Sequence, residues 1–139
     1  MQEEFSDDNR SALIAEIDRL VSLYVRIKDA RSDGMNTCYV CGEMLHYKQM
    51  CNSHFIQRSE TGLRFDYIHN CKPSCYNCNN RHEIDTKPFA DKLEAEQAGI
   101  VAYLTEQSRQ ITKLSISDLK ELRIGMQEKL RIAQLKLKS

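Results

Sequence analysis

Two Cys-x-x-Cys pairs, Cys38 with Cys41 and Cys75 with Cys78, constrain this chain more than any other feature. Each two-residue loop can place two sulfurs about 2.3 Å from one Zn²⁺ ion, and two loops together complete a tetrahedron. A redox site would not need a second copy of the motif, so zinc is favoured over a redox pair or a set of buried free cysteines. We therefore expect one structural zinc ion held by these four residues.

The remaining cysteines and the hydropathy pattern bear on the compartment. No basic stretch followed by an apolar one opens the chain, and no run reaches the roughly 18 apolar residues of a membrane span. We therefore expect a cytoplasmic protein with no membrane partner, where cysteines bind metal more often than they form disulfides. Cys51 and Cys71 lie outside the two pairs. We expect both to be small packing residues, although either could replace a metal ligand.

The charge distribution is more informative than the total charge. At 139 residues the chain has the length of one domain, and 20 basic residues balance 20 acidic ones, so the net charge predicts no partner. By segment the formal charge is −3 for residues 1–34, +2 for 35–82, −3 for 83–112 and +4 for 113–139. The positive centre and C-terminal segment permit contact with nucleic acid without requiring it.

The fold class follows from the periodicity along the chain. Apolar residues at a spacing of three to four predict an amphipathic helix over about residues 10–31, ending near Gly34. Its expected cap is Ser6, Asp7 or Asp8. Residues 36–82 have no sustained helical period and predict short strands and loops followed by a short helix. We expect a mostly helical α+β fold, with an N-terminal arm (1–34), a Cys-rich centre (35–85) and C-terminal helices (86–139) in one structural domain.

Three helices are expected in the C-terminal region. The first begins with Pro88 in its first turn and ends at Gly99, and a shorter one lies within residues 100–111. The third is capped by Ser115 or Ser117 and has an apolar stripe of Leu119, Leu122, Met126, Leu130, Ala133 and Leu137. That stripe is most simply core packing, with contact between the subunits of a homodimer as the alternative.

The separation between the two Cys pairs indicates an inserted segment with a function of its own. A plain zinc ribbon spaces its pairs by about 15–20 residues, whereas 33 residues lie between Cys41 and Cys75 here. The insertion contains His54 midway and Asn70 near its end, and Asn79 follows the last cysteine. Histidine, asparagine, and a Cys-x-x-Cys pair followed by a second asparagine is the order of an HNH, or ββα-metal, nuclease.

The stretches "SHFIQRSETGLRF" and "CYNCN" resemble the phage NinG (lambda Rap-like) recombination endonuclease family, over about residues 36–135. The resemblance implies a zinc-stapled ββα-metal centre flanked by helices. It also implies a metal-dependent DNA endonuclease that hydrolyses phosphodiester bonds in branched recombination intermediates. A phage-encoded protein of this kind would act in the host cell cytoplasm.

Three catalytic residues are expected from this pattern. His54 suits a general base, because histidine has an ordinary pKa of about 6.5 and is largely neutral at cellular pH. The resemblance implies that Asn70 forms local hydrogen bonds that hold the base loop in place. It also places Asn79 at the start of a helix, where its hard, neutral amide oxygen suits Mg²⁺ or Mn²⁺. His46, His69 and His82 compete for the base role, but none occupies the motif position.

A second ligand for the catalytic ion is open at this stage. Many ββα-metal enzymes have an acidic residue or a histidine immediately before the base, where this chain has Ser53. The other ligand could be water or one of the nearby candidates Asp66, His82, Glu83 and Asp85.

Basic residues near the motif predict contacts to the nucleic-acid backbone, with solvated surface charge as the alternative. They are Arg58, Arg64, Lys72 and Arg81. The sequence leaves open the choice between DNA and RNA, the preferred branch structure, the cleavage polarity and the oligomeric state. The competing function is a catalytically inactive zinc module that binds nucleic acid or protein.

Overall fold

The structure is a computed structural model that describes residues 9–57, 62–110 and 113–137. Arg58 and the proposed caps Ser6, Asp7 and Asp8 lie outside these ranges. In chain order the elements are α2 (Arg10–Ile27), β1 (Met35–Thr37), β2 (Met44–His46), the 3₁₀ turn η1 (Tyr47–Gln49), β3 (Cys51–His54), the 3₁₀ turn η2 (Gly62–Phe65), β4 (Cys71–Ser74), α3 (Tyr76–His82), α4 (Lys87–Glu96), α5 (Ile100–Ser108) and α6 (Ile116–Gln134). The expected mixed α and β composition, with short strands before a short helix, is confirmed.

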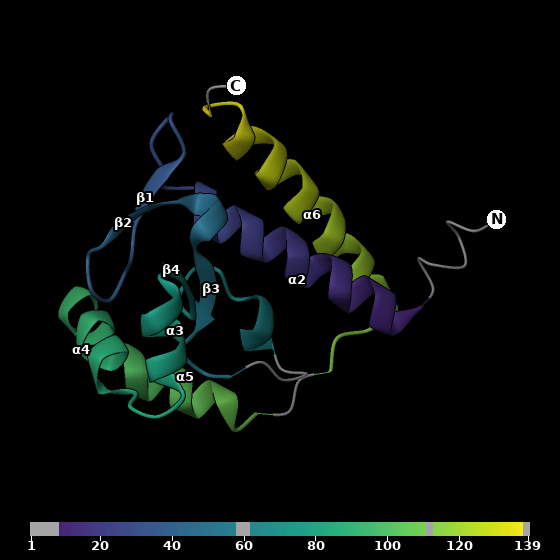
Figure 1. The fold of residues 1–139 in the computed structure, drawn as a ribbon. Helices are drawn as coiled ribbons and strands as arrows, with labels where there is room; N and C mark the ends of the chain where they lie inside the picture. The colour runs from purple at the N-terminus through teal and green to yellow at the C-terminus, as the bar shows by residue number, and fades with distance from the viewer. Residues whose placement is uncertain (1–8, 58–61, 111–112, 138–139) are drawn as a thin grey trace.

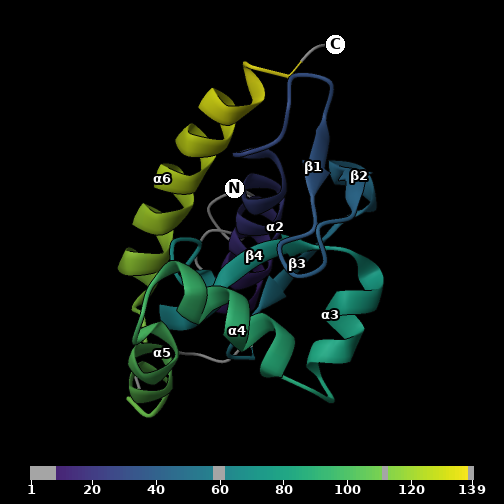
Figure 2. The ribbon, with the colours of Figure 1, turned by 90° about the vertical axis from the view of Figure 1, so that its left-hand side faces the viewer.

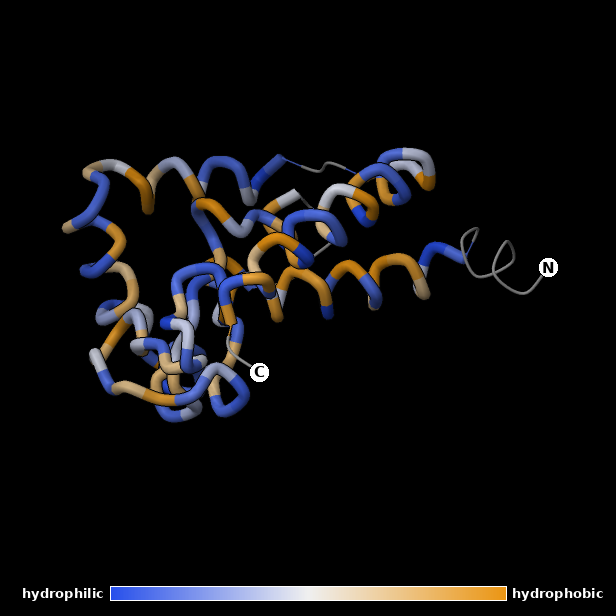
Figure 3. Tube along the Cα trace, turned by 90° about the horizontal axis from the view of Figure 1, so that it is seen from above, coloured by the Kyte–Doolittle hydropathy of each residue, from blue (hydrophilic) through white to orange (hydrophobic). Residues whose placement is uncertain are grey.

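Helices α2 and α6 form the main hydrophobic core, although they come from opposite ends of the chain. They lie side by side (Figure 1), and along α2 apolar positions recur between polar ones (Figure 3). Leu119, Met126 and Leu130 of α6 are buried against α2, and the other residues of the predicted stripe pack at the edge of the same cluster. The interpretation of that stripe as core packing is confirmed. Burial of each such side chain contributes about 1.5–3 kcal/mol.

Helix α2 is shorter than its sequence pattern predicts. It begins after Asn9, whose side chain accepts a hydrogen bond from the Ala12 amide at 3.0 Å, so the expectation of a cap at residues 6–8 was wrong. It ends at Ile27 rather than near residue 31. The Asn36 side chain donates to the Arg26 carbonyl at 2.9 Å, which satisfies a carbonyl at the helix end from outside the helix.

Strands β3 and β4 and helix α3 follow one another in β-β-α order. The two strands are antiparallel, with His54 opposite Cys71 and Cys51 opposite Ser74. A second two-stranded sheet pairs β1 with β2. Figure 2 shows β3 and β4 between α2 on one side and α3 on the other, and both helices contact β3. One end of β3 therefore lies between two helices.

Helices α4 and α5 pack together beside this unit and form a second hydrophobic cluster around Phe89 and Leu104. Gly99, at a φ of 88°, lies between them in a conformation that favours glycine, as its predicted role at a helix boundary requires. The cap of α6 is Ser115, which forms a reciprocal capping box with Asp118. Within the described ranges, no helix has the length and apolarity needed to cross a membrane.

Candidate metal centre and active-site cleft

The four cysteines of the two predicted pairs converge on one point. Cys38 and Cys41 lie in the turn between β1 and β2, whereas Cys75 caps α3 and Cys78 lies within its first turn. Their sulfurs all lie within 4.8 Å of one another, and those of Cys41 and Cys75 are 3.9 Å apart. A tetrahedral zinc site with bonds of about 2.3 Å has sulfurs about 3.8 Å apart. The cluster can therefore hold a metal ion such as zinc.

Backbone hydrogen bonds and burial act in opposite directions on the thiols of this cluster. Burial opposes ionisation of Cys38, but backbone N–H groups, that of Cys41 foremost, lower its pKa to about 7. Burial raises the pKa of the Cys75 and Cys78 thiols. A bound divalent cation would offset that penalty, because a coordinating thiol loses its proton. Burial also raises the pKa of Cys71 to about 12, and this residue packs in the main core as expected.

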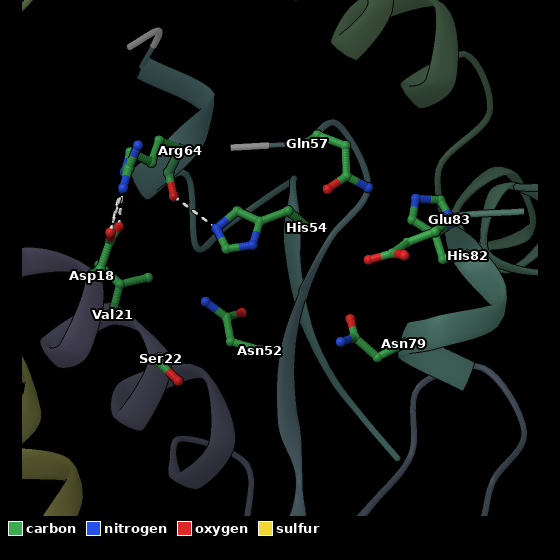
Figure 4. A pocket seen from close by; sticks show the side chains of 10 residues that line it. All are labelled: Asp18, Val21, Ser22, Asn52, His54, Gln57, Arg64, Asn79, His82 and Glu83. Carbon is green, nitrogen blue, oxygen red and sulfur yellow. Dashed lines mark hydrogen bonds and ion pairs between the residues drawn. The ribbon is translucent and has the colours of Figure 1, made fainter. Parts of the chain in front are cut away.

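A polar cleft of about 270 Å³ lies beside the end of β3, between α2 and α3 (Figure 4). It is lined by Asp18, Val21, Ser22, Asn52, His54, Gln57, Arg64, Asn79, His82 and Glu83. Asn52 and His54 alternate with Ser53 along β3, so they share the face that points to the cleft. The cleft therefore combines a histidine, hard oxygen donors and a guanidinium from segments far apart in sequence.

His54 is held in a defined tautomer by the backbone of η2. Its Nε2 lies 3.0 Å from the carbonyl oxygen of Arg64. Because a carbonyl only accepts, Nε2 of the neutral ring must bear the hydrogen, and Nδ1 then has the basic lone pair. Figure 4 shows the second ring nitrogen on the side of the ring that faces Asn79 and Glu83. A base at Nδ1 would thus act toward the middle of the cleft.

Asn70 fixes the loop that follows His54. It is fully buried, its side-chain oxygen accepts from the Ile56 amide at 2.8 Å, and its nitrogen donates to the carbonyls of Ile56 at 3.1 Å and Leu63 at 3.0 Å. The Asn70 carbonyl also accepts from the amide of Phe55 at 2.9 Å. The expected local hydrogen bonds to the base loop are present. The catalytic effect of this bracing stays a prediction.

Asn79 of α3 and Glu83 at the end of that helix both present side-chain oxygens to the cleft. They are four residues apart, Glu83 being the C-terminal cap of the helix, and both line the cleft. The Asn79 side-chain oxygen also accepts a hydrogen bond from Ser53 at 2.5 Å. An amide oxygen and a carboxylate are hard donors of the kind that Mg²⁺ and Mn²⁺ prefer. Glu83 thus becomes the best placed of the second-ligand candidates.

The family of the chain can be stated at this point. The family model described as Bacteriophage Lambda NinG protein matches residues 6–136. The chain belongs to the NinG family. No curated protein and no solved structure matches it significantly. The matched range includes α2, which the sequence resemblance over residues 36–135 had left out.

The other second-ligand candidates of this NinG-family chain are placed less favourably. His82 lines the cleft, but it is 5% exposed, its Nε2 bonds to the Phe55 carbonyl at 2.8 Å, and its ring packs on Phe89. Asp66 accepts from two backbone amides and pairs with His69 at 3.3 Å. Asp66 and Asp85 are absent from the described cleft lining. His82 therefore joins α3 to the residue after His54.

The predicted backbone-contacting residues do not all surround the site. Arg64 lines the cleft, where Asp18 binds its guanidinium through two nitrogens at 2.6–3.2 Å. Lys72 lies instead against the Tyr39 ring, 5.0 Å from its centroid, and Arg81 is exposed on α3. Neither contributes to the described lining of the cleft. Their contact with nucleic acid stays a prediction.

Sequence reasoning missed the contribution of α2 to the cleft. Asp18, Val21 and Ser22 form one wall, and Asp18 reaches Arg64 across 46 positions of sequence. Asp18 lies one residue from the buried Ile17, next to the apolar face of the helix. A charged residue at the edge of a buried face was the available signal, but helical periodicity does not identify its partner.

Proposed function

We propose that this NinG-family protein is a metal-dependent DNA endonuclease that hydrolyses phosphodiester bonds in branched recombination intermediates. The observation that supports this most strongly is the cleft that brings His54, Asn79, Glu83 and Arg64 together around the end of β3. The β-β-α order of the surrounding elements agrees with a ββα-metal nuclease. Family membership supports the choice of DNA recombination as the setting.

In this proposal His54 is the general base. Its Nε2–H donates to the Arg64 carbonyl, so Nδ1 can accept a proton from a water molecule in the cleft. The Arg64 carbonyl then stabilises the imidazolium that forms, because the hydrogen bond from Nε2 strengthens when the ring becomes charged. Asn70 holds Ile56 through its side chain and Phe55 through its carbonyl, and thereby limits movement of the ring relative to the scissile phosphate.

The residues present fit a hard divalent cation. Asn79 and Glu83 would hold Mg²⁺ or Mn²⁺, with water at the remaining positions. The ion would supply stabilisation of charge on the phosphate and on the departing oxygen. The cysteine cluster is chemically distinct, because four thiolates favour zinc and leave no position open for substrate. It would keep α3 in place and so direct Asn79 to the cleft.

Arg64 is the proposed contact to the phosphate. Asp18 forms an ion pair with the Arg64 guanidinium, and the Arg64 side chain is 22% exposed. A guanidinium held by a carboxylate is oriented before substrate arrives, so less rotamer entropy is lost when a phosphate oxygen approaches.

A catalytically inactive zinc module that binds nucleic acid or protein is the competing function. The conjunction of His54, Asn79 and Glu83 in one cleft favours the nuclease, because a module that only binds has no need of a base beside hard metal ligands.

The test is a cleavage panel of linear, nicked, flapped and four-way DNA with Mg²⁺ or Mn²⁺, and a matched RNA duplex. We expect metal-dependent cleavage of the branched substrates above that of the linear duplex. If the RNA duplex were cleaved in preference to every DNA substrate, the proposed substrate would be RNA instead of DNA. Binding of the panel without cleavage of any member, by a zinc-loaded protein, would support the inactive module.

A further inference from the structure

Two buried serine hydroxyls connect the cysteine cluster to Asn79. Ser53 lies in β3 and Ser74 at the end of β4, and each is 1% exposed. The Ser53 hydroxyl forms hydrogen bonds with the Ser74 hydroxyl and with the side-chain oxygen of Asn79. Burial of a hydroxyl costs free energy unless it is hydrogen-bonded, so these three groups constrain one another.

The direction of these bonds follows from the number of protons. The Asn79 oxygen can only accept, so the single hydroxyl proton of Ser53 is directed to it at 2.5 Å. Ser74 must then donate its own proton to Ser53. Because Ser74 immediately precedes Cys75, the chain of bonds begins beside a cysteine ligand and ends on the amide in the cleft.

We propose that Ser53 is a positioning residue that orients the Asn79 amide so that its oxygen, and not its nitrogen, is presented to the catalytic cation. An amide oxygen has two lone pairs, and the hydroxyl of Ser53 occupies one while fixing the oxygen on the β3 side. The other lone pair then serves the ion. Without Ser53 the amide can rotate by about 180° and present N–H donors, which repel a cation. This inference rests on the proposed metal-dependent activity.

The test measures Mn²⁺ binding by electron paramagnetic resonance on the zinc-loaded full chain without DNA, and then the Mg²⁺ dependence of cleavage. Loss of a hydrogen bond that orients a metal ligand typically weakens binding 10–100-fold, so we expect about tenfold weaker Mn²⁺ binding in Ser53→Ala. Ser53→Thr keeps the hydroxyl and should restore binding. The rate at saturating metal should change less than the metal concentration required.

Ser74→Ala is the matched control, because it removes the Ser53–Ser74 hydrogen bond as Ser53→Ala does but leaves the Ser53 donor to Asn79 in place. It should also lower the melting temperature, and it should keep Mn²⁺ binding within about threefold of wild type, since the hydrogen bond from Ser53 to Asn79 is retained. Ser108→Ala on α5 controls for serine loss elsewhere.

If Ser53→Ala fails to fold, the Ser53→Ala/Ser74→Ala double variant removes both hydroxyls, so that neither is left buried without a partner. It should show the same tenfold loss of Mn²⁺ affinity.

Two results would overturn the inference while leaving the nuclease intact. One is a folded Ser53→Ala protein, or the folded double variant, with wild-type Mn²⁺ binding. The other is a loss of Mn²⁺ affinity in Ser74→Ala equal to that in Ser53→Ala, which would tie the effect to stability. Wild-type protein that binds no Mn²⁺ would instead contradict the proposed metal-dependent function.

Discussion

At the scale of single residues, the side chains that line the cleft differ from those that hold other residues in place. His54 and Asn79 face the cleft, whereas Asn70 is buried behind the loop and has its amide saturated by backbone groups. The sequence resemblance predicts these three residues and the local hydrogen bonds of Asn70, but not its complete burial, because residue order along the chain does not report which side chains are buried.

Asn79 is expected to govern the metal requirement. Asn79→Ala removes the oxygen ligand, so the Mg²⁺ concentration that supports half-maximal cleavage should rise about 10-fold or more, and Asn79→Asp, which keeps a hard oxygen, should recover much of the loss. Metal titrations of the cleavage rate measure this effect. Asn77→Ala, an exposed change on the same helix, is the control. An unchanged Mg²⁺ requirement in Asn79→Ala would remove this residue from the metal site.

Asn70 is expected to affect stability and rate together. Asn70→Ala leaves buried groups of Ile56 and Leu63 without partners, at a cost of about 1–3 kcal/mol for each unsatisfied group. Denaturant unfolding should show this loss, and the cleavage rate should fall with little change in the Mg²⁺ requirement. A variant of normal stability and normal rate would show that the loop is held by other contacts.

At the scale of elements, the two Cys-x-x-Cys pairs and the Ser115 cap of α6 are where sequence and structure agree best. The spacing of two Cys-x-x-Cys pairs predicts the cysteine cluster, because that geometry is local and needs only two turns to meet. The end of α2 and the position of Asp18 could not be predicted similarly. Both depend on Asn36 and Arg64, whose approach to α2 is set by the tertiary fold.

Removal of zinc is expected to unfold the central elements. The cluster joins the β1–β2 turn to the start of α3, and binding of structural zinc supplies on the order of 10 kcal/mol. One zinc per chain should be found by metal analysis, and a strong chelator should lower the helical circular dichroism and the melting temperature. Cys78→Ser should behave like the chelated protein. Cys51→Ser, outside the cluster, should keep its zinc, and loss of zinc from it would revise the ligand set.

At the scale of the whole molecule, α2 and α6 join the two ends of the chain into the core that supports one wall of the cleft. The apolar stripe of α6 is used within the chain, so dimerisation through the C-terminal helices stays a prediction that would need other residues. Seven basic residues against three acidic ones follow Thr112, and one of them, Lys129, is exposed on α6.

Exposed basic residues of α6 are expected to contribute to DNA affinity. Deletion of the residues after Leu130 would also remove core packing, so Lys129→Gln tests the charge alone. Loss of one phosphate contact should weaken binding to branched DNA and reduce the salt slope by about one unit. Lys87→Gln on α4, in the acidic segment, is the control. Equal affinities and salt slopes for both variants and wild type would exclude Lys129 from the DNA path.

The proposal that this fold assembles a catalytic base is tested most directly by single-turnover cleavage of branched DNA by His54→Ala. General-base catalysis contributes roughly 10²–10⁴-fold, so we predict a rate loss of that size with DNA binding, zinc content and the Mg²⁺ requirement retained. The wild-type rate should rise with pH and level off as an imidazole loses its proton. A His54→Ala protein with a near-normal rate would contradict the account, most clearly if His82→Ala, folded and zinc-loaded, were inactive.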